Sequence, residues 1–96
     1  MNMVLCVSYI AKPGMREAFL KEIESLGIQG KVEREAGCIR YEYYRSARNE
    51  DELLLVEKWE SEGHQAEHVK QPHMAALREL KEQYVVSTHV EKSFCI

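Results

Sequence analysis

The residues best suited to acid–base chemistry gather in one stretch, from Glu57 to Met74. This stretch contains the single tryptophan, Trp59, and three of the four histidines, His64, His68 and His73. An unperturbed imidazole has a pKa of about 6.5, so a neutral histidine here accepts a proton at neutral pH. The stretch is therefore the primary candidate for a catalytic site.

Two histidines and one carboxylate in this stretch indicate a proton-transfer site. His68 and His73 flank Pro72, and a helix that is broken at the proline can turn both toward one cavity. Glu57 lies two residues before Trp59 on an apolar strand, so both face the same side. A buried carboxylate costs several kcal/mol unless it is paired, and His68 or His73 is the obvious partner. We therefore predict that His68, His73 and Glu57 are catalytic residues.

The aromatic residues Trp59 and Tyr41 are candidates for the wall of a substrate-binding pocket. A pocket with aromatic walls and a few polar groups suits a flat organic molecule. A lone tryptophan at a strand end also packs in a core, and His68 or His73 can equally cap the helix broken at Pro72. The sequence leaves these structural interpretations open beside the functional ones.

A metal site has weaker support in the sequence. His64 and His68 are four residues apart, which places them on one face of a helix within reach of a shared ion. A third ligand is required, and nothing selects one among Glu57, Glu60 and Glu67. We therefore predict no metal and no cofactor, and we interpret His64 as a solvated helix residue.

The composition narrows the classes of partner. The 96 residues suffice for one domain, spanning 1–96, and the net charge of −3 leaves no basic stripe for nucleic acid. The apolar run from Met3 to Ile10 is too short to span a bilayer and lacks the features of a signal peptide. Cys6, Cys38 and Cys95 are odd in number and far apart, which favours reduced thiols. These features predict a cytoplasmic protein without nucleic-acid or membrane partners.

The hydrophobic patterns predict two helices and four strands that position these residues. The first helix follows Pro13-Gly14 and continues to Leu26, and a short further turn is expected over 31–36 after a break at Gly27 and Gly30. The second helix begins at the N-cap Ser61, is interrupted at Pro72 and then resumes. Strands are expected at Met3 to Ile10, covered on both faces, and at Cys38 to Arg45, Leu53 to Trp59 and Tyr84 to Phe94.

The order strand, helix, strand, strand, helix, strand is the split βαβ, or ferredoxin-like, arrangement. We predict an α+β fold of the type βαββαβ, with a four-stranded antiparallel sheet and both helices on one face. In the second strand, Ile39, Tyr41 and Tyr43 should share a face. The helix-free face would expose more apolar area than a monomer usually does, so we expect a homodimer through the sheet faces.

Four sequence fragments, in order, resemble a known family. They are Pro13-Gly14 after the first strand, Glu35-Ala36-Gly37-Cys38-Ile39-Arg40-Tyr41 entering the second, Glu57-Lys58-Trp59 closing the third, and His68 with Pro72-His73-Met74. Together they resemble the antibiotic biosynthesis monooxygenase (ABM) domain over essentially the whole chain. The resemblance implies a dimeric α+β barrel with a ligand cavity between the sheet and the helices of each subunit.

The resemblance also implies several activities. Some ABM members are cofactor-independent monooxygenases of quinols or phenolic polyketides, one branch isomerises a phosphorylated dione signalling metabolite, and another degrades haem. The haem branch uses an Asn, a Trp and a His where this chain has Ser8, His68 and Arg78, so haem is disfavoured. An isomerase needs a phosphate site, for which Arg40 or Lys70 is available. We expect a monooxygenase of a small quinol or phenol; the alternatives are the isomerase and a non-catalytic binding or stress-response module.

Overall fold

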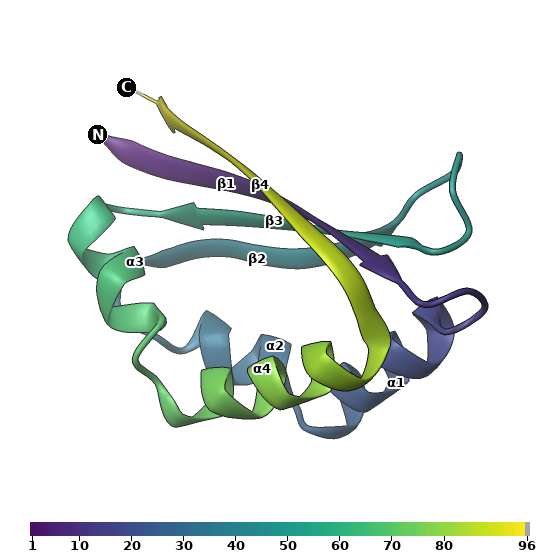
Figure 1. Ribbon diagram of the computed structural model, residues 1–96. Coiled ribbons are helices and arrows are strands. Elements are labelled where there is room, and N and C mark those ends of the chain that lie inside the picture. Colours follow the sequence, from purple (N-terminus) through teal and green to yellow (C-terminus); the bar gives the residue numbers. More distant parts are fainter. Residues whose placement is uncertain (96) are drawn as a thin grey trace.

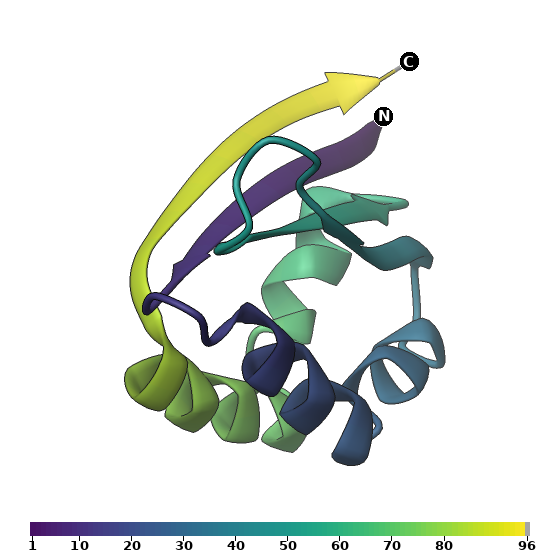
Figure 2. The same cartoon turned by 90° about the vertical axis from the view of Figure 1, so that its right-hand side faces the viewer.

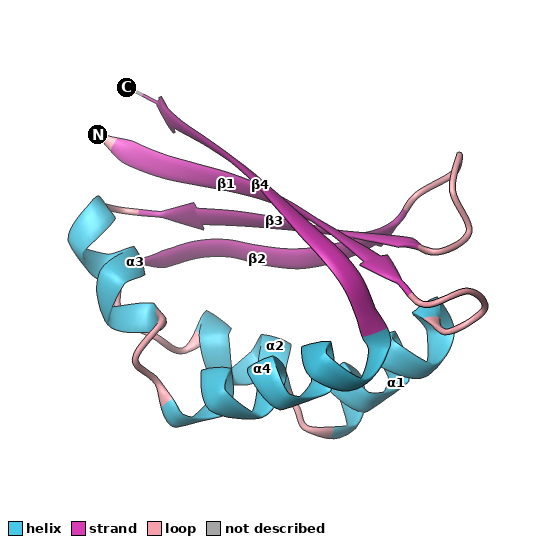
Figure 3. Cartoon of the chain, in the orientation of Figure 1, coloured by secondary structure: helices cyan, strands magenta, loops and turns pink. Residues whose placement is uncertain are grey.

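The computed structural model describes residues 1–95, which form a four-stranded sheet with helices on one face (Figures 1 and 3). The strands lie in the order β2-β3-β1-β4, and every neighbouring pair is antiparallel. This is the predicted ferredoxin-like arrangement, in which a short second helix follows the first and the last helix is divided at Pro72. The elements are β1 (Asn2–Ala11), α1 (Arg16–Ser25), α2 (Ile28–Glu33), β2 (Cys38–Arg45), β3 (Glu52–Trp59), α3 (Glu62–His68), α4 (Pro72–Tyr84) and β4 (Val85–Cys95).

Alternation in the two central strands places the core between the sheet and the helices. β1 buries every second residue from Met3 to Ala11, whereas Cys6 on its other face is exposed. β3 alternates in the same way and buries Leu53, Leu55, Glu57 and Trp59. The chain thus covers one face of β1, not the two that we predicted. Figure 2 shows the sheet arching over the helices, with β4 at its outer edge.

The long helices contribute apolar stripes to this core. α1 buries Phe19, Leu20 and Ile23, and α4 buries Leu77 and Leu80. Each large apolar side chain that is fully buried stabilises the fold by about 1.5–3 kcal/mol. Within residues 1–95, no helix has both the length and the apolar character that a membrane crossing requires.

Glycine and proline mark the breaks in the helical layer. Gly27 adopts a φ of 63°, in the left-handed region, between α1 and α2. Gly30 lies inside α2, so the predicted break at this glycine is wrong and the short helix begins earlier than the predicted turn. Pro72 is the first residue of α4, where its missing N–H costs nothing. The predicted interruption at Pro72 is confirmed.

The predicted face of β2 is wrong at one position. The pairing of β2 with β3 shifts between Cys38 and Arg40, as at a β-bulge. Ile39 is therefore 47% exposed, and Cys38 packs against the core instead. Tyr41 and Tyr43 do share the core face.

Candidate acid–base site

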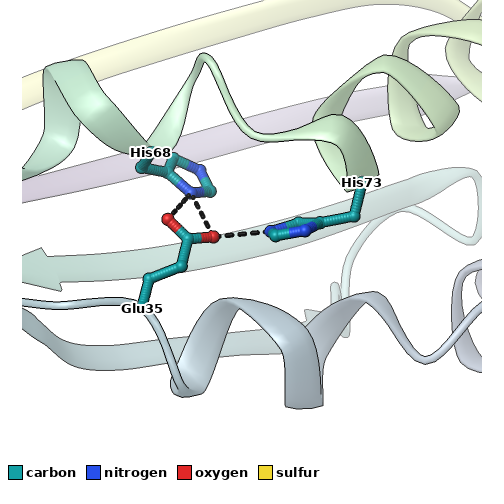
Figure 4. Close-up of side chains that lie close together, drawn as sticks. All are labelled: Glu35, His68 and His73. Atoms are coloured by element: carbon teal, nitrogen blue, oxygen red, sulfur yellow. Dashed lines mark hydrogen bonds and ion pairs between the residues drawn. The ribbon is translucent and has the colours of Figure 1, made fainter.

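Glu35 joins His68 and His73 at one end of the layer between sheet and helices (Figure 4). Glu35 lies in the turn between α2 and β2, His68 is the last residue of α3, and His73 is the second residue of α4. Both carboxylate oxygens of Glu35 lie 3.0 Å from Nδ1 of His68, and Oε2 lies 2.6 Å from Nε2 of His73. We call these three residues the Glu35 cluster.

Backbone contacts fix the turn that carries Glu35. The Glu35 N–H donates to the Val32 carbonyl at 2.9 Å, and the Cys38 N–H donates to the Glu35 carbonyl at 3.2 Å. Gly37 has a φ of 81°, and a Cβ at this position would overlap the ring of His64. Glycine is therefore required here by both the backbone conformation and the close approach.

His64 supports this turn and does not join the Glu35 cluster. Its backbone N–H donates to Oγ of the N-cap Ser61 at 3.2 Å, and its Nδ1 lies 2.8 Å from the same oxygen. Because the ring packs against Gly37 and is only partly exposed, our interpretation of His64 as a solvated residue is wrong.

The break at Pro72 brings His68 and His73 to the same carboxylate. The Gln71 N–H donates to the His68 carbonyl at 3.1 Å, and the Met74 N–H donates to the Gln71 carbonyl at 3.0 Å. These two bonds hold the short connection between α3 and α4 in a defined turn. An uninterrupted helix would place residues five positions apart on different faces.

The bonds to Glu35 define the tautomers of the two histidines. An ionised carboxylate only accepts hydrogen bonds, so His68 donates through Nδ1–H and His73 donates through Nε2–H. In the neutral rings, the lone pairs are then on Nε2 of His68 and on Nδ1 of His73. Within residues 1–95, no protein group forms a hydrogen bond with His73 Nδ1. This nitrogen is therefore available to accept a proton.

Two aromatic rings enclose His68. The ring centroids of Trp59 and His68 are 4.6 Å apart at an angle of 36°, and the Tyr41 ring meets His68 edge-on at 5.6 Å. All three side chains are almost fully buried. Trp59 and Tyr41 thus enclose the His68 ring in the core. That they form the wall of a substrate-binding pocket stays a prediction.

Glu57 lies on the inner side of His68. Its Oε1 accepts a hydrogen bond from the Trp59 Nε1–H at 3.0 Å and lies 3.8 Å from His68 Nε2. Burial raises the pKa of the Glu57 carboxyl, and the bond from Trp59 and the proximity of His68 only partly oppose this effect. The distance of 3.8 Å exceeds that of a direct hydrogen bond. Glu35, not Glu57, therefore makes the direct contact that orients His68.

Exposure changes across this group of residues. The side chains of His73 and Glu35 are 14% and 10% exposed, whereas His68 is 2% exposed. A substrate in contact with the cluster would therefore meet His73 first. His68 lies behind the carboxylate and is suited to a supporting role.

Two tyrosines and a cysteine near the cluster are neutral at neutral pH. Burial raises the pKa values of the Tyr41 and Tyr43 hydroxyls, whose oxygens lie 3.4 Å apart, so both remain protonated at neutral pH. Burial also raises the pKa of the Cys38 thiol to about 11. The thiol beside the cluster is therefore a poor nucleophile.

A separate cavity of about 450 Å³ opens beside the other half of β2. Its lining includes apolar residues of α1 and α2, the Tyr43 ring, Arg45 and the carboxylates of Glu24 and Glu33. Arg45 is paired with Glu17 at 2.8 Å. No residue of the Glu35 cluster lines this cavity. Tyr43 connects the two regions, because its hydroxyl meets that of Tyr41 and the Tyr41 ring contacts His68.

The structure brings together all five residues that we selected from the sequence. His68 contacts Glu57, Trp59 and Tyr41, and His73 joins it through Glu35. Sequence reasoning missed Glu35 as a site residue. Its only signal was the Glu35-Ala36-Gly37 fragment, in which a carboxylate precedes a glycine at a strand entry. The roles of the five residues in catalysis and substrate binding stay predictions.

Comparisons with known proteins place the chain in a family. The chain is similar to protein SO0527 from Shewanella oneidensis, with 30% identity over 96% of this chain and 88% of the other and a TM-score of 0.82. PA3566 from Pseudomonas aeruginosa, at 19% identity, has a TM-score of 0.87 over 99% and 94% of the two chains. Rv0793 from Mycobacterium tuberculosis, at 22% identity, has a TM-score of 0.86 over 100% and 96%. No curated protein matches the sequence. The sequence profile named Antibiotic biosynthesis monooxygenase matches residues 3–80, so the chain belongs to the ABM family.

Proposed function

We propose that this protein oxidises a small quinol or phenolic compound with O₂, without a flavin or a metal, and that His73 accepts the phenolic proton. Family membership supports a monooxygenase-type function. The observation that carries the finer proposal is the bond between Glu35 and His73 Nε2 at 2.6 Å, which leaves Nδ1 as a basic nitrogen on the most exposed ring of the cluster.

The proposed reaction begins with proton transfer from the phenol to His73 Nδ1. The phenolate gives one electron to O₂, the two radicals combine at a ring carbon that bears hydrogen, and the imidazolium of His73 returns its proton to form the hydroperoxide. Loss of water then leaves a carbonyl at that carbon. One oxygen atom enters the quinone, the other leaves as water, and the substrate supplies all four electrons that O₂ accepts.

The first step sets the energetic requirement. A phenol has a pKa of about 10 and free imidazole about 6.5, so the proton transfer is uphill by roughly 5 kcal/mol. The Glu35 carboxylate, already bonded to His73, would stabilise the imidazolium that forms. Each charge-assisted hydrogen bond contributes about 1.5–3 kcal/mol, so two or three such bonds would meet the requirement.

Other predicted site residues have supporting roles in this proposal. Glu57 and Trp59 hold His68 from the inner side, and His68 in turn holds the Glu35 carboxylate. Tyr41 completes the enclosure of His68. No residue of the cluster lines the 450 Å³ cavity, so a substrate whose body lies in this cavity would have to extend past Tyr43 to bring its hydroxyl to His73.

Oxygen uptake with a panel of quinols and phenols tests the proposal. Chelator-treated protein should consume O₂ faster than buffer for at least one compound, and the product formed under ¹⁸O₂ should contain one labelled oxygen. No uptake above the uncatalysed rate across the panel would contradict the proposal. A chelator must be present because free metal ions oxidise quinols without the protein.

A non-catalytic binding module is the second candidate function, and one observation favours it. The 450 Å³ cavity contains no histidine among its lining residues, so a ligand could occupy it without meeting a titrating ring. Binding of a panel compound without O₂ uptake would support this candidate.

The isomerase alternative lacks such support. Arg45, the cation at the cavity, already pairs with Glu17, and two carboxylates share the lining. Arg40 bonds the Tyr44 hydroxyl, and Lys70 pairs with Glu67 at 3.3 Å. This charge pattern does not suit a phosphorylated substrate.

We also propose that the protein forms a homodimer through its sheet. Large apolar side chains remain exposed on the strands, and Val86, Val90 and Phe94 of β4 are 64%, 50% and 47% exposed. A monomer rarely leaves such a group in water. Light scattering coupled to size exclusion should give twice the chain mass of 11.2 kDa. A monomeric mass at micromolar concentration would contradict this assembly.

A further inference from the structure

The Glu35 cluster contains the ligand types and the spacing of a transition-metal site. His68 Nδ1, His73 Nε2 and a Glu35 carboxylate oxygen all lie within 4.8 Å of one another. Two imidazoles and one carboxylate are a recurrent zinc ligand set in proteins, in which water completes the coordination. The pair that the sequence suggested, His64 with His68, is not the pair that the fold brings together.

The distances are close to those that a bound ion requires. With metal–ligand bonds of about 2.0–2.1 Å, neighbouring ligand atoms in a tetrahedral site lie about 3.3 Å apart. The observed separations of 3.0 Å and 2.6 Å from Glu35 to the two rings need to widen by about 0.3 Å and 0.7 Å. The two ring nitrogens lie within 4.8 Å of each other, so small side-chain rotations of Glu35 and the histidines would bring the three ligand atoms around one ion.

The three ligands come from anchored backbone positions. Glu35 is held in its turn by bonds to Val32 and Cys38, and the connection from His68 to His73 is closed by the Gln71 N–H. Little conformational entropy would therefore be lost when an ion binds. The carboxylate at 10% exposure and His73 at 14% leave the site open to solvent on one side.

Glu57 completes the site as an outer carboxylate. A metal-bound histidine usually donates its other ring N–H to a carboxylate, which fixes the ring orientation. If Nδ1 of His68 binds a metal, the ring proton moves to Nε2, which lies 3.8 Å from Glu57 Oε1. Glu57 is itself held by the Trp59 N–H at 3.0 Å. Glu57 therefore lies on the side of His68 that a supporting carboxylate would occupy, and it would have to move closer to accept the Nε2–H.

We propose that Glu35, His68 and His73 bind a divalent transition-metal ion of the zinc type, which replaces the two N–H protons now donated to Glu35. Proton and metal compete for the same atoms, so the bound ion fixes Glu35 and His73 and prevents them from acting as a base. The binding itself is independent of the proposed function. The loss of activity on metal binding rests on that function.

Competition with a chromogenic chelator tests the binding. Zn²⁺ should bind to the EDTA-stripped protein with one ion per chain. Co²⁺ bound in its place should give the visible absorption bands that indicate a coordination number of four or five. Mg²⁺, which prefers oxygen ligands, should not compete. Glu35→Gln and His73→Asn should each weaken Zn²⁺ binding by at least about 100-fold, and Glu57→Gln should weaken it by about 10- to 100-fold.

Two matched variants keep the test decisive. His89→Asn removes an exposed histidine of β4 and should leave Zn²⁺ binding unchanged, and Gln71→Ala changes the connection between His68 and His73 without removing a ligand, with unfolding curves confirming that every variant is folded. No stoichiometric binding by the wild type, or binding that His89→Asn removes and His73→Asn does not, would overturn the proposal. Because no substrate enters this measurement, its failure leaves the oxygenase proposal standing. Conversely, metal binding without O₂ uptake would reject the oxygenase alone.

Discussion

The Glu35 cluster and the 450 Å³ cavity occupy the two halves of β2 and have opposite characters. The cluster concentrates titratable groups in direct contact, with little space between them. The cavity has space, its lining mixes apolar side chains with polar and charged ones, and its arginine is paired elsewhere. Proton transfer needs the first kind of environment, and binding of an organic molecule needs the second. The comparison suggests that chemistry and binding are divided between neighbouring regions.

Tyr41 and Tyr43 form the boundary between these regions. They are two residues apart on β2, and their side chains share the core face. Their rings meet edge-on at 5.7 Å, and only Tyr43 reaches the cavity lining. The division is therefore set by a step of two residues along one strand. Variants on either side of this boundary should have different kinetic effects.

The largest expected effect is on the cluster side. Glu35→Gln replaces the carboxylate that orients both histidines, and it should lower kcat/KM by about 100-fold or more, the usual range for a misplaced general base. A steady-state O₂ assay measures the change, and Glu22→Gln on an exposed part of α1 serves as the matched control. Equal activities of the two variants would refute a role for the cluster in catalysis.

Substitutions in the lining of the cavity should mainly change KM. Gly30 lies on α2 at the cavity, and a Cβ added there would meet only the Arg34 guanidinium at 3.9 Å. Gly30→Phe would fill the space and should raise KM by about 10-fold with little change in kcat, as expected for lost uniform binding. Gly63→Phe on α3, away from the cavity, is the control. A fall in kcat as large as that of Glu35→Gln would show that the regions are not separate.

The pH dependence of stability should reveal the buried Glu57. Its pKa is raised above the usual value of 4.5, chiefly by burial, so the folded state holds this proton at pH values where the unfolded state has released it. Relative to Glu57→Gln, the wild type should have full stability below pH 4.5 and lose stability as the pH rises toward the folded pKa. The slope should not exceed about 1.4 kcal/mol per pH unit.

Urea unfolding of both proteins with a chelator present measures this difference in the free energy of unfolding. The exposed Glu60→Gln provides the matched control for a change of carboxylate to amide. If the wild type instead gained stability relative to Glu57→Gln as the pH rose above 4.5, Glu57 would be ionised and well paired in the fold.

The smallest effects concern the two glycines at the cavity. Gly30 has helical geometry and free space, so Gly30→Ala should raise the free energy of unfolding by about 0.5–1 kcal/mol. Gly27 has a φ of 63°, so Gly27→Ala should lower it by about 1–2 kcal/mol despite the open space. Chemical denaturation of both variants checks that the two changes in the free energy of unfolding have opposite signs. Two changes of the same sign would show that the helix break at Gly27 is misassigned.

Much of the fold could be predicted from the sequence because it follows from hydrophobic periodicity. The strands and the break at Pro72 were predicted to within a residue or two, since alternation and proline geometry act locally. The exposure of Ile39 was not predicted, because a β-bulge changes the phase of alternation without a sequence signal. The same limit applies to Gly30, which the surrounding contacts keep inside α2 against its low helix propensity.

The site was predicted in part for the same reason. His68, His73, Glu57 and Trp59 lie on periodic elements, so their faces could be inferred. Glu35 lies in a turn, where no period relates a side chain to the core, and its contacts span 33 and 38 residues of sequence. The carboxylate that links the histidines could therefore be identified only once α2, α3 and α4 were placed together.

The central claim is that His73 accepts the substrate proton, and a side-by-side O₂ uptake assay tests it most directly. Metal-free wild type, His73→Asn and His89→Asn would each be assayed with the best quinol or phenol of the panel, after unfolding curves show that all three are folded. The account predicts that His89→Asn, at an exposed position of β4, retains wild-type activity and that His73→Asn loses about 100- to 10,000-fold of kcat/KM. Wild-type uptake by His73→Asn would contradict it.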